Sequence, residues 1–141
     1  MVEAASAHSF PVRVYYEDTD AAGIVYYANY LRFAERARTE MLRTIGIGQR
    51  NPEEEAGVSF AVRRCSVEYL APARLDDMLE IRTRITGLSG AAIEAEQIVR
   101  CDANDLARLT VMLVCRDRRG RATRLPKTVR EALNRFTESK Q

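Results

Sequence analysis

ANYLRFAERARTEMLRTI, residues 28–45, is the segment that decides the fold. Its apolar side chains recur every three or four residues, which is the spacing that places them on one face of a helix. Gly46 follows directly, at the position where a helix commonly ends in a left-handed glycine. The segment therefore predicts one long amphipathic helix. Its apolar face consists of Tyr30, Phe33, Ala34, Ala37, Met41, Leu42 and Ile45.

Alternating apolar and polar side chains on both sides of this helix predict β-strands. Residues 10–16 form one such strand, and four runs follow the helix, with hairpin turns at residues 88–90 and 103–105. Residues 126–136 predict a short C-terminal amphipathic helix. The sequence thus predicts an α+β fold, with an antiparallel meander wrapped around one central helix. The inward positions expected in the four runs are Val58, Phe60 and Val62; Leu79, Ile81, Thr83 and Ile85; Ile93, Ala95, Gln97 and Val99; and Leu109, Val111, Leu113 and Cys115.

A length of 141 residues with 46% hydrophobic and 30% charged side chains is typical of one soluble domain. We expect flexible tails at residues 1–8 and 138–141 and a single domain at residues 9–137. The first residues lack the basic and apolar regions of a secretory signal. No apolar run reaches the ~20 residues of a membrane-spanning helix. A cytoplasmic protein without a membrane span is therefore expected.

The net charge of +2 gives no general attraction to nucleic acid, but basic residues gather in one place. Residues 116–130 contain seven Lys or Arg and a single acid, Asp117. Such a run is either a solvated face or an anchor for an anionic ligand such as a phosphate, which arginine binds through its planar fork of donors.

The cysteines are three in number, Cys65, Cys101 and Cys115, and they include no C-x-x-C pair. All three lie in predicted strands. We therefore expect small buried hydrophobic residues in a reducing compartment, and neither disulfides nor zinc ligands.

Residues 15–30, YYEDTDAAGIVYYANY, concentrate the groups that are able to do chemistry. Three acidic residues, including Asp18 and Asp20, precede a turn glycine and the start of the apolar helix. A helix N-terminus has unpaired N–H groups and a partial positive charge, which suit an oxyanion. A carboxylate beside such donors can attack a carbonyl or activate water to attack it. The alternative, on the residues alone, is that Asp18 and Asp20 only cap the turn.

The pattern D-x-D-x-x-G-I-V-Y-Y-x-N-Y, residues 18–30, resembles the 4-hydroxybenzoyl-CoA thioesterase family of hotdog-fold proteins. RFAERARTEMLR, residues 32–43, is similar to the helix of its Tol-Pal-associated acyl-CoA thioesterase branch. The resemblance extends over about residues 12–125. It implies the hotdog fold, hydrolysis of an acyl-CoA to the free acid and coenzyme A, and no metal or other cofactor. It also implies a homodimer or homotetramer with active sites at subunit interfaces.

Position by position, the resemblance implies that Asp20 is the catalytic carboxylate. The backbone N–H of Tyr27 is then the donor that polarises the thioester carbonyl. Asp18 is expected to hold the loop by hydrogen bonds, and Asn29 and Tyr30 are expected to set the loop against the helix.

Substrate contacts are expected from Gly23, Ile24 and Val25, with Gly23 permitting a close approach of the chain to the ligand. In the basic run, Arg118 and Arg119 are the hypothesised contacts for the phosphates of coenzyme A.

The chain departs from both groups of relatives. Tyr27 takes the place of a histidine found in many members of the Tol-Pal-associated branch, so an acid–base role of that histidine is absent. Ala21 and Ala28 take the place of prolines in aryl-specific relatives. The backbone donor survives either side chain, whereas the preference for alkyl or aryl groups stays open.

Other catalytic candidates are weaker. Glu35 corresponds to a second hotdog branch that uses a helical glutamate, but among Arg32, Arg36 and Arg38 it is expected to be a surface ion-pair partner. His8 is the only histidine, and it lies in the expected tail. The sequence also lacks the G-x-S-x-G motif, which would carry a serine nucleophile for a histidine base. A histidine-dependent hydrolase or hotdog hydratase is therefore disfavoured.

Two functions of different classes follow from these observations. The first is an acyl-CoA thioesterase that uses Asp20. The second is a non-catalytic module that binds acyl-CoA or acyl carrier protein, or that belongs to an envelope complex. Thioester hydrolysis by the purified protein, and its loss in Asp20→Asn, separates the two.

Overall fold

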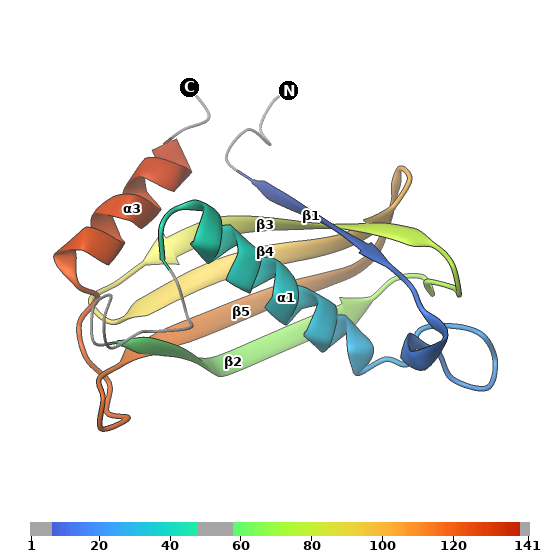
Figure 1. Ribbon diagram of the computed structural model, residues 1–141, viewed down its shortest axis with the longest axis horizontal. Helices are drawn as coiled ribbons and strands as arrows, with labels where there is room; N and C mark the ends of the chain where they lie inside the picture. The colour runs from blue at the N-terminus through green and yellow to red at the C-terminus, as the bar shows by residue number, and fades with distance from the viewer. Residues whose placement is uncertain (1–6, 48–57, 139–141) are drawn as a thin grey trace.

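The computed structural model describes residues 7–47 and 58–138. Five antiparallel strands form one sheet that curves around the long helix α1, and a second helix closes the chain (Figure 1). This arrangement confirms the predicted α+β fold. The elements are β1 (His8–Arg13), the 3₁₀ turn η2 (Tyr16–Asp18), α1 (Asn29–Thr44), β2 (Ser59–Tyr69), β3 (Met78–Leu88), β4 (Ala92–Cys101), β5 (Asn104–Arg116) and α3 (Lys127–Glu138).

Helix α1 lies across the sheet, mainly over β1, β3 and β4 (Figure 1). Every predicted apolar position of α1 is buried except Ile45, which is half-buried. The helix ends at Thr44, and the predicted left-handed glycine, Gly46 with φ of 90°, follows the C-cap residue Ile45. There the Ile47 N–H donates to the Leu42 carbonyl at 2.8 Å, and the Gly46 N–H donates to the Arg43 carbonyl at 3.1 Å. Burial of one face and the turn at Gly46 together fix where α1 ends.

The sheet has the strand order β1-β3-β4-β5-β2. The predicted inward positions of β3, β4 and β5 are all buried, which confirms their alternation. These three strands form a meander joined by the two predicted hairpin turns, whereas β2 lies at the edge of the sheet beside β5. Residues 70–77 cross the end of the sheet and carry the chain from β2, at one edge, to β3. Hydrogen bonds from Leu70 N–H to Leu106 O (2.9 Å) and from Val14 N–H to Asp77 O (2.9 Å) hold this crossing in place.

The ends of the domain differ slightly from expectation. β1 occupies His8–Arg13 where residues 10–16 were predicted. It begins inside the expected tail because His8 pairs with Thr83 of β3. The remainder of that tail, residues 1–6, and residues 139–141 lie outside the described residues. In the part of the chain that is described, neither helix is long and apolar enough to cross a membrane.

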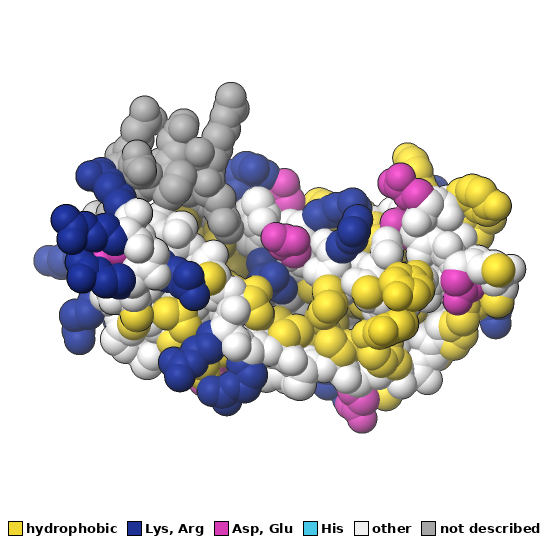
Figure 2. Space-filling model, turned by 90° about the horizontal axis from the view of Figure 1, so that it is seen from below, with side chains coloured by type: hydrophobic (Ala, Val, Ile, Leu, Met, Phe, Trp, Pro, Cys, Tyr) yellow, Lys and Arg dark blue, Asp and Glu magenta, His cyan; other side chains and the backbone are white. Residues whose placement is uncertain are grey.

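The edge strand β2 is less covered than the other strands. Its residues Val62, Cys65, Val67 and Tyr69 pair with inward positions of β5, so they lie on the helix-facing side of the sheet. Because α1 lies mainly over other strands, Val62 stays 49% exposed and Tyr69 47% exposed. We call these four residues the open strip. Figure 2, seen from the β2 side, shows hydrophobic side chains at the surface along this part of the molecule.

The prediction that all three cysteines are buried is wrong, and the uncovered edge explains the exposure of Cys65. Only Cys115 is buried, whereas Cys101 is half-buried and Cys65 is exposed. Burial raises the pKa of the Cys115 thiol. Strand alternation predicts which side of the sheet a residue faces, but it does not predict whether another element covers that side.

A small polar network lies inside the core, and the sequence did not predict it. Gln97 donates through Nε2 to the Ala34 carbonyl at 2.9 Å and to Thr83 Oγ1 at 3.0 Å. Its Oε1 accepts a hydrogen bond from Arg38 Nη1 at 3.0 Å. Thr83 and Gln97 are fully buried and Arg38 is only 9% exposed. The network therefore ties α1 to β3 and β4 through groups that have no water to replace their partners.

Gln97→Met should lower the free energy of unfolding by about 1–3 kcal/mol, because it removes the hydrogen-bond partner of the buried Arg38 side chain and the bonds to Ala34 and Thr83. Urea denaturation followed by circular dichroism measures this loss. The double variant with Arg38→Met should lose less than the sum of the single variants, since the second change removes the unpaired charge. Strictly additive losses would mean that the two side chains act independently.

Candidate active site

The chain between β1 and α1 folds into a small hairpin, residues 19–25, which we call the loop hairpin (Figure 1). Thr19 and Val25 form an antiparallel bridge. The Asp20 N–H donates to the Ile24 carbonyl at 2.9 Å. The acidic segment is thus a closed turn with a defined backbone rather than an open loop.

Asp18 fastens the loop hairpin to the start of α1. Its side chain is only 5% exposed. One carboxylate oxygen accepts the Tyr15 N–H at 2.8 Å, and the other accepts the Asn29 side-chain amide at 2.9 Å. The Asp18 carbonyl accepts the Tyr26 N–H at 2.9 Å. These bonds confirm the structural role expected for Asp18 and for Asn29.

Asp20 has a different environment from Asp18. Its side chain is exposed, and its Oδ1 accepts the Ala22 N–H at 2.8 Å. No other side-chain hydrogen bond or ion pair of Asp20 occurs within residues 7–47 and 58–138. One carboxylate oxygen therefore stabilises the turn while the other is available to a ligand.

Gly23 closes the turn after Asp20, with φ of 79° and its N–H donating to the Asp20 carbonyl at 3.0 Å. A Cβ at this position would meet no atom within 4 Å. The left-handed backbone, not a crowded approach, is thus what requires glycine in the single chain. Ile24 is half-buried, and Val25 is 4% exposed, so the side chain of Val25 belongs to the core.

Tyr27 lies two residues before α1 begins. Its carbonyl accepts a hydrogen bond from the Tyr69 hydroxyl at 3.0 Å. Its N–H makes no hydrogen bond within the described ranges, as is usual for donors at a helix N-terminus. The predicted oxyanion donor is therefore unoccupied by any protein acceptor among these residues.

Tyr69 is a site residue that the sequence analysis missed. Its ring centroid lies 6.2 Å from that of Tyr27 and 5.5 Å from that of Tyr30. The Tyr30 hydroxyl in turn accepts the Ala73 N–H at 3.0 Å. Burial raises the pKa of both Tyr30 and Tyr69. A tyrosine at a strand end carries no distinctive sequence signal, and its partner lies 42 residues away along the chain.

Arg118 and Arg119 lie in the turn between β5 and α3, and both are exposed. The turn is built on Asp117, whose Oδ1 accepts the N–H groups of Arg119 at 2.9 Å and of Arg121 at 3.0 Å. Figure 2 shows basic side chains gathered at this end of the molecule. The single acid of the basic run thus shapes the turn that presents its arginines.

This basic turn lies far from Asp20 within one chain. Tyr69, beside the loop hairpin, pairs with Ala107 at one end of β5, whereas the basic turn follows Arg116 at the other end. Nine residues of strand separate the two ends by about 30 Å. Figure 1 shows the two segments at opposite ends of the sheet. The structure therefore does not bring Arg118 and Arg119 together with Asp20 in a single chain.

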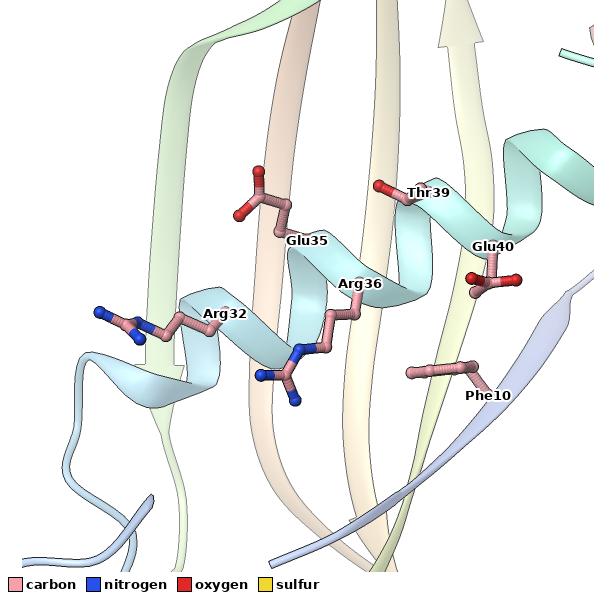
Figure 3. A pocket seen from close by; sticks show the side chains of 6 residues that line it. All are labelled: Phe10, Arg32, Glu35, Arg36, Thr39 and Glu40. Carbon is pink, nitrogen blue, oxygen red and sulfur yellow. The ribbon is translucent and has the colours of Figure 1, made fainter. Parts of the chain in front are cut away.

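Figure 3 shows a hollow on the outward face of α1, lined by Phe10, Arg32, Glu35, Arg36, Thr39 and Glu40. Glu35 is exposed, which confirms its predicted surface position. The expected ion pair does not form among the described residues. Arg36 extends to the other side of the helix (Figure 3), and Arg38 turns inward to Gln97. Within the same ranges, no three His, Cys, Asp or Glu side chains are placed to hold a metal ion.

Known proteins resemble this chain both in sequence and in structure. The chain is 52% identical over 109 residues to a protein of Escherichia coli O6:H1 named acyl-CoA thioester hydrolase YbgC, covering 77% of this chain and 81% of that protein. A solved structure described as a probable thioesterase from Bartonella henselae is 36% identical, with a TM-score of 0.80 over 85% of this chain and 99% of that chain.

A 4-hydroxybenzoyl-CoA thioesterase variant complexed with 4-hydroxybenzoyl-CoA has a TM-score of 0.85 over 91% of this chain and 99% of that chain. Its sequence is 22% identical, so it supports the fold alone. The model of the family described as Thioesterase-like superfamily matches residues 14–133, which is most of the domain. The chain therefore belongs to the Thioesterase-like superfamily of hotdog-fold proteins, as the pattern in residues 18–30 predicted.

Proposed function

We propose that this protein hydrolyses the thioester of an acyl-CoA to the free acid and coenzyme A. The observation that carries the proposal is the pairing of an exposed carboxylate, Asp20, with an unused N–H at Tyr27, on one short segment fastened to α1 by Asp18. The similarity to a protein named acyl-CoA thioester hydrolase supports the same chemistry.

In the proposed reaction, the thioester carbonyl oxygen accepts a hydrogen bond from the Tyr27 N–H. Asp20 either attacks the carbonyl carbon, giving an anhydride that water then opens, or removes a proton from the attacking water. In both routes the carbon–sulfur bond breaks, water supplies the new hydroxyl, and the coenzyme A thiolate leaves. Charge that develops on the oxygen is stabilised by the helix N-terminus.

We propose that the site is completed by a second copy of the chain. In the single chain Asp20 is exposed, and β2 is an unpaired edge with apolar side chains at the surface. Antiparallel pairing of two β2 edges about a two-fold axis would continue the sheet and place the open strips of the two subunits side by side. A homotetramer would then form from two such dimers.

Two-fold pairing also gives the distant arginines a role. Because paired antiparallel strands run in opposite directions, the basic end of one subunit lies beside the loop hairpin of its partner. We propose that Arg118 and Arg119 bind the phosphates of coenzyme A in the partner's site, while Gly23 and Ile24 line the path to the thioester. Arginine suits this task because its fork of donors matches a phosphate.

The acyl group could be carried by coenzyme A or by acyl carrier protein. Acyl carrier protein presents the same phosphopantetheine thioester and is a second possible carrier of the acyl group. We propose the cytoplasm as the compartment, since the three cysteines are free thiols.

Asp20→Asn should lower kcat for acyl-CoA hydrolysis by at least about 100-fold, because the amide is neutral and neither attacks nor accepts a proton. Release of free thiol from acyl-CoA measures the rate. The thermal midpoint should stay close to that of the wild-type protein, since Asn keeps the acceptor oxygen for the Ala22 N–H.

Asp18→Asn is the matched control two residues away. It should lower the thermal midpoint, because the buried carboxylate accepts two hydrogen bonds. Glu35→Gln, on the outward face of α1, should change neither kcat nor stability. Full activity in Asp20→Asn would contradict the proposed mechanism. Absence of hydrolysis by the wild-type protein would favour a non-catalytic binding module.

Charge reversal of Arg118 and Arg119 to Glu should raise KM for an acyl-CoA by about tenfold with little change in kcat, because the phosphates lie far from the reacting carbonyl. Steady-state kinetics measures both constants. The same change should leave KM unaltered for a short acyl thioester of N-acetylcysteamine, which has no phosphate. An unchanged KM for acyl-CoA would exclude these arginines.

Subunit mixing tests whether the arginines act across the interface. Asp20→Asn subunits mixed with the Arg118→Glu/Arg119→Glu subunits should form hybrids with one complete site, which has the wild-type KM. If the arginines serve their own chain, the only active site in the hybrid keeps the raised KM. That second result would contradict the proposed pairing of β2 edges.

A further inference from the structure

Residues 69–75, the last residue of β2 and most of the crossing to β3, contact both halves of the candidate active site. We call this segment the brace. Its second half pairs with residues 23–25 of the loop hairpin, as a short antiparallel ladder. The ladder consists of the bond from the Val25 N–H to the Ala73 carbonyl (2.8 Å), the bridge between Ile24 and Arg74, and the bond from the Leu75 N–H to the Gly23 carbonyl (3.2 Å). The turn that carries Asp20 is therefore fixed relative to the brace.

The first residue of the brace, Tyr69, holds the segment that carries the proposed oxyanion donor. Its hydroxyl donates to the Tyr27 carbonyl at 3.0 Å. Its ring lies edge-on to the rings of Tyr27 and Tyr30, with interplanar angles of 82° and 67°. Tyr30 is only 3% exposed, so one of the two rings that Tyr69 contacts belongs to the core. Ring packing thus holds the Tyr69 hydroxyl at the backbone of the donor segment.

The hydrogen bond from Tyr69 completes the fixing of the backbone on both sides of the Tyr27 Cα. The peptide group that contains the Tyr27 N–H also contains the Tyr26 carbonyl, which accepts the Asn29 N–H at 2.8 Å. The next peptide group contains the Tyr27 carbonyl, which accepts from Tyr69. Because each peptide group is planar, a bond to each one restricts both backbone dihedral angles of Tyr27. The bond to the Tyr26 carbonyl also polarises the N–H of the same peptide group.

One short segment therefore sets both the position of the carboxylate and the direction of the N–H. Without the Tyr69 hydroxyl, the loop hairpin keeps its ladder to the brace, and Asp20 keeps its place. The peptide group after Tyr27 loses its only hydrogen bond to the brace among the described residues. The donor then becomes free to turn relative to the carboxylate.

We propose that Tyr69 is a positioning residue for thioester hydrolysis, which sets the Tyr27 N–H at the distance and angle from Asp20 that the thioester carbonyl requires. Its hydroxyl acts through the backbone of Tyr27 and touches no reacting atom. Stabilisation of an oxyanion depends on preorganised donors, and a misplacement of about 1 Å costs about 100-fold in rate. This inference rests on the proposed thioesterase function.

Tyr69→Phe removes the hydroxyl and keeps the ring. It should lower kcat for butyryl-CoA by at least about tenfold, because the donor is no longer held in place. KM should stay within about twofold of the wild-type value, since the donor acts mainly on charge that develops in the transition state. Tyr16→Phe is the matched control. Tyr16 is 83% exposed, its hydroxyl makes no hydrogen bond within the described residues, and the change should alter neither constant.

An infrared measurement separates positioning from a general loosening of the fold. The probe is the dethia analogue of butyryl-CoA, a ketone in which a methylene group replaces the sulfur, so that it binds without being hydrolysed. Donation from the Tyr27 N–H should move the carbonyl band of the bound ketone to lower frequency than in water. Most of this shift should be lost in Tyr69→Phe and kept in Tyr16→Phe. A merely structural role of Tyr69 would weaken binding of the ketone but leave the band of the bound molecule in place.

Either of two results would overturn the role of Tyr69: a wild-type kcat in Tyr69→Phe, or a lowered kcat with an unchanged carbonyl band. If hydrolysis still depends on Asp20 in these cases, the proposed thioesterase stands and only the role of Tyr69 fails. Conversely, a band shift that requires Tyr69, in a protein whose hydrolysis does not depend on Asp20, supports the positioning role and contradicts the proposed mechanism alone.

Discussion

The burial of α1 against the helix-facing side of the sheet is the constraint on which the other features depend. The helix is long enough to cross several strands, but it is too narrow to cover all five of them. It lies mainly over β1, β3 and β4 and leaves the side of β2 at the edge. The same placement produces a stable core, a fixed helix N-terminus, and an uncovered apolar strip.

The position of the candidate catalytic groups follows from how the start of α1 is held. Asp18 ties the loop hairpin to Asn29, and Tyr69 ties the segment before the helix to the end of β2. The first tie is a hydrogen bond to a buried carboxylate, and the second is a neutral hydrogen bond from a tyrosine hydroxyl to a backbone carbonyl. The carboxylate at position 20 is therefore carried on a rigid turn, which is what a group that must meet a carbonyl at a defined angle requires.

Positively charged side chains are distributed unevenly around α1 and the sheet. The arginines of the basic turn stand about 30 Å from the loop hairpin along β5. One buried arginine lies beneath the helix, where a neutral glutamine is its partner. The buried arginine belongs to the core network that ties α1 to the sheet, whereas the basic turn is understandable if a second subunit completes the site.

The sequence by itself determined the long helix, its glycine stop, the inward faces of β3 to β5, and the loop-holding role of Asp18. These features are local, because a period of 3.6 or 2 and a turn glycine act over a few residues. The sequence alone did not determine the position of β2 at the edge, the exposure of Cys65, the burial of Arg38, or the bond from Tyr69 to the segment before α1. Each of these depends on which distant segments meet, and only the packing of the whole chain decides that.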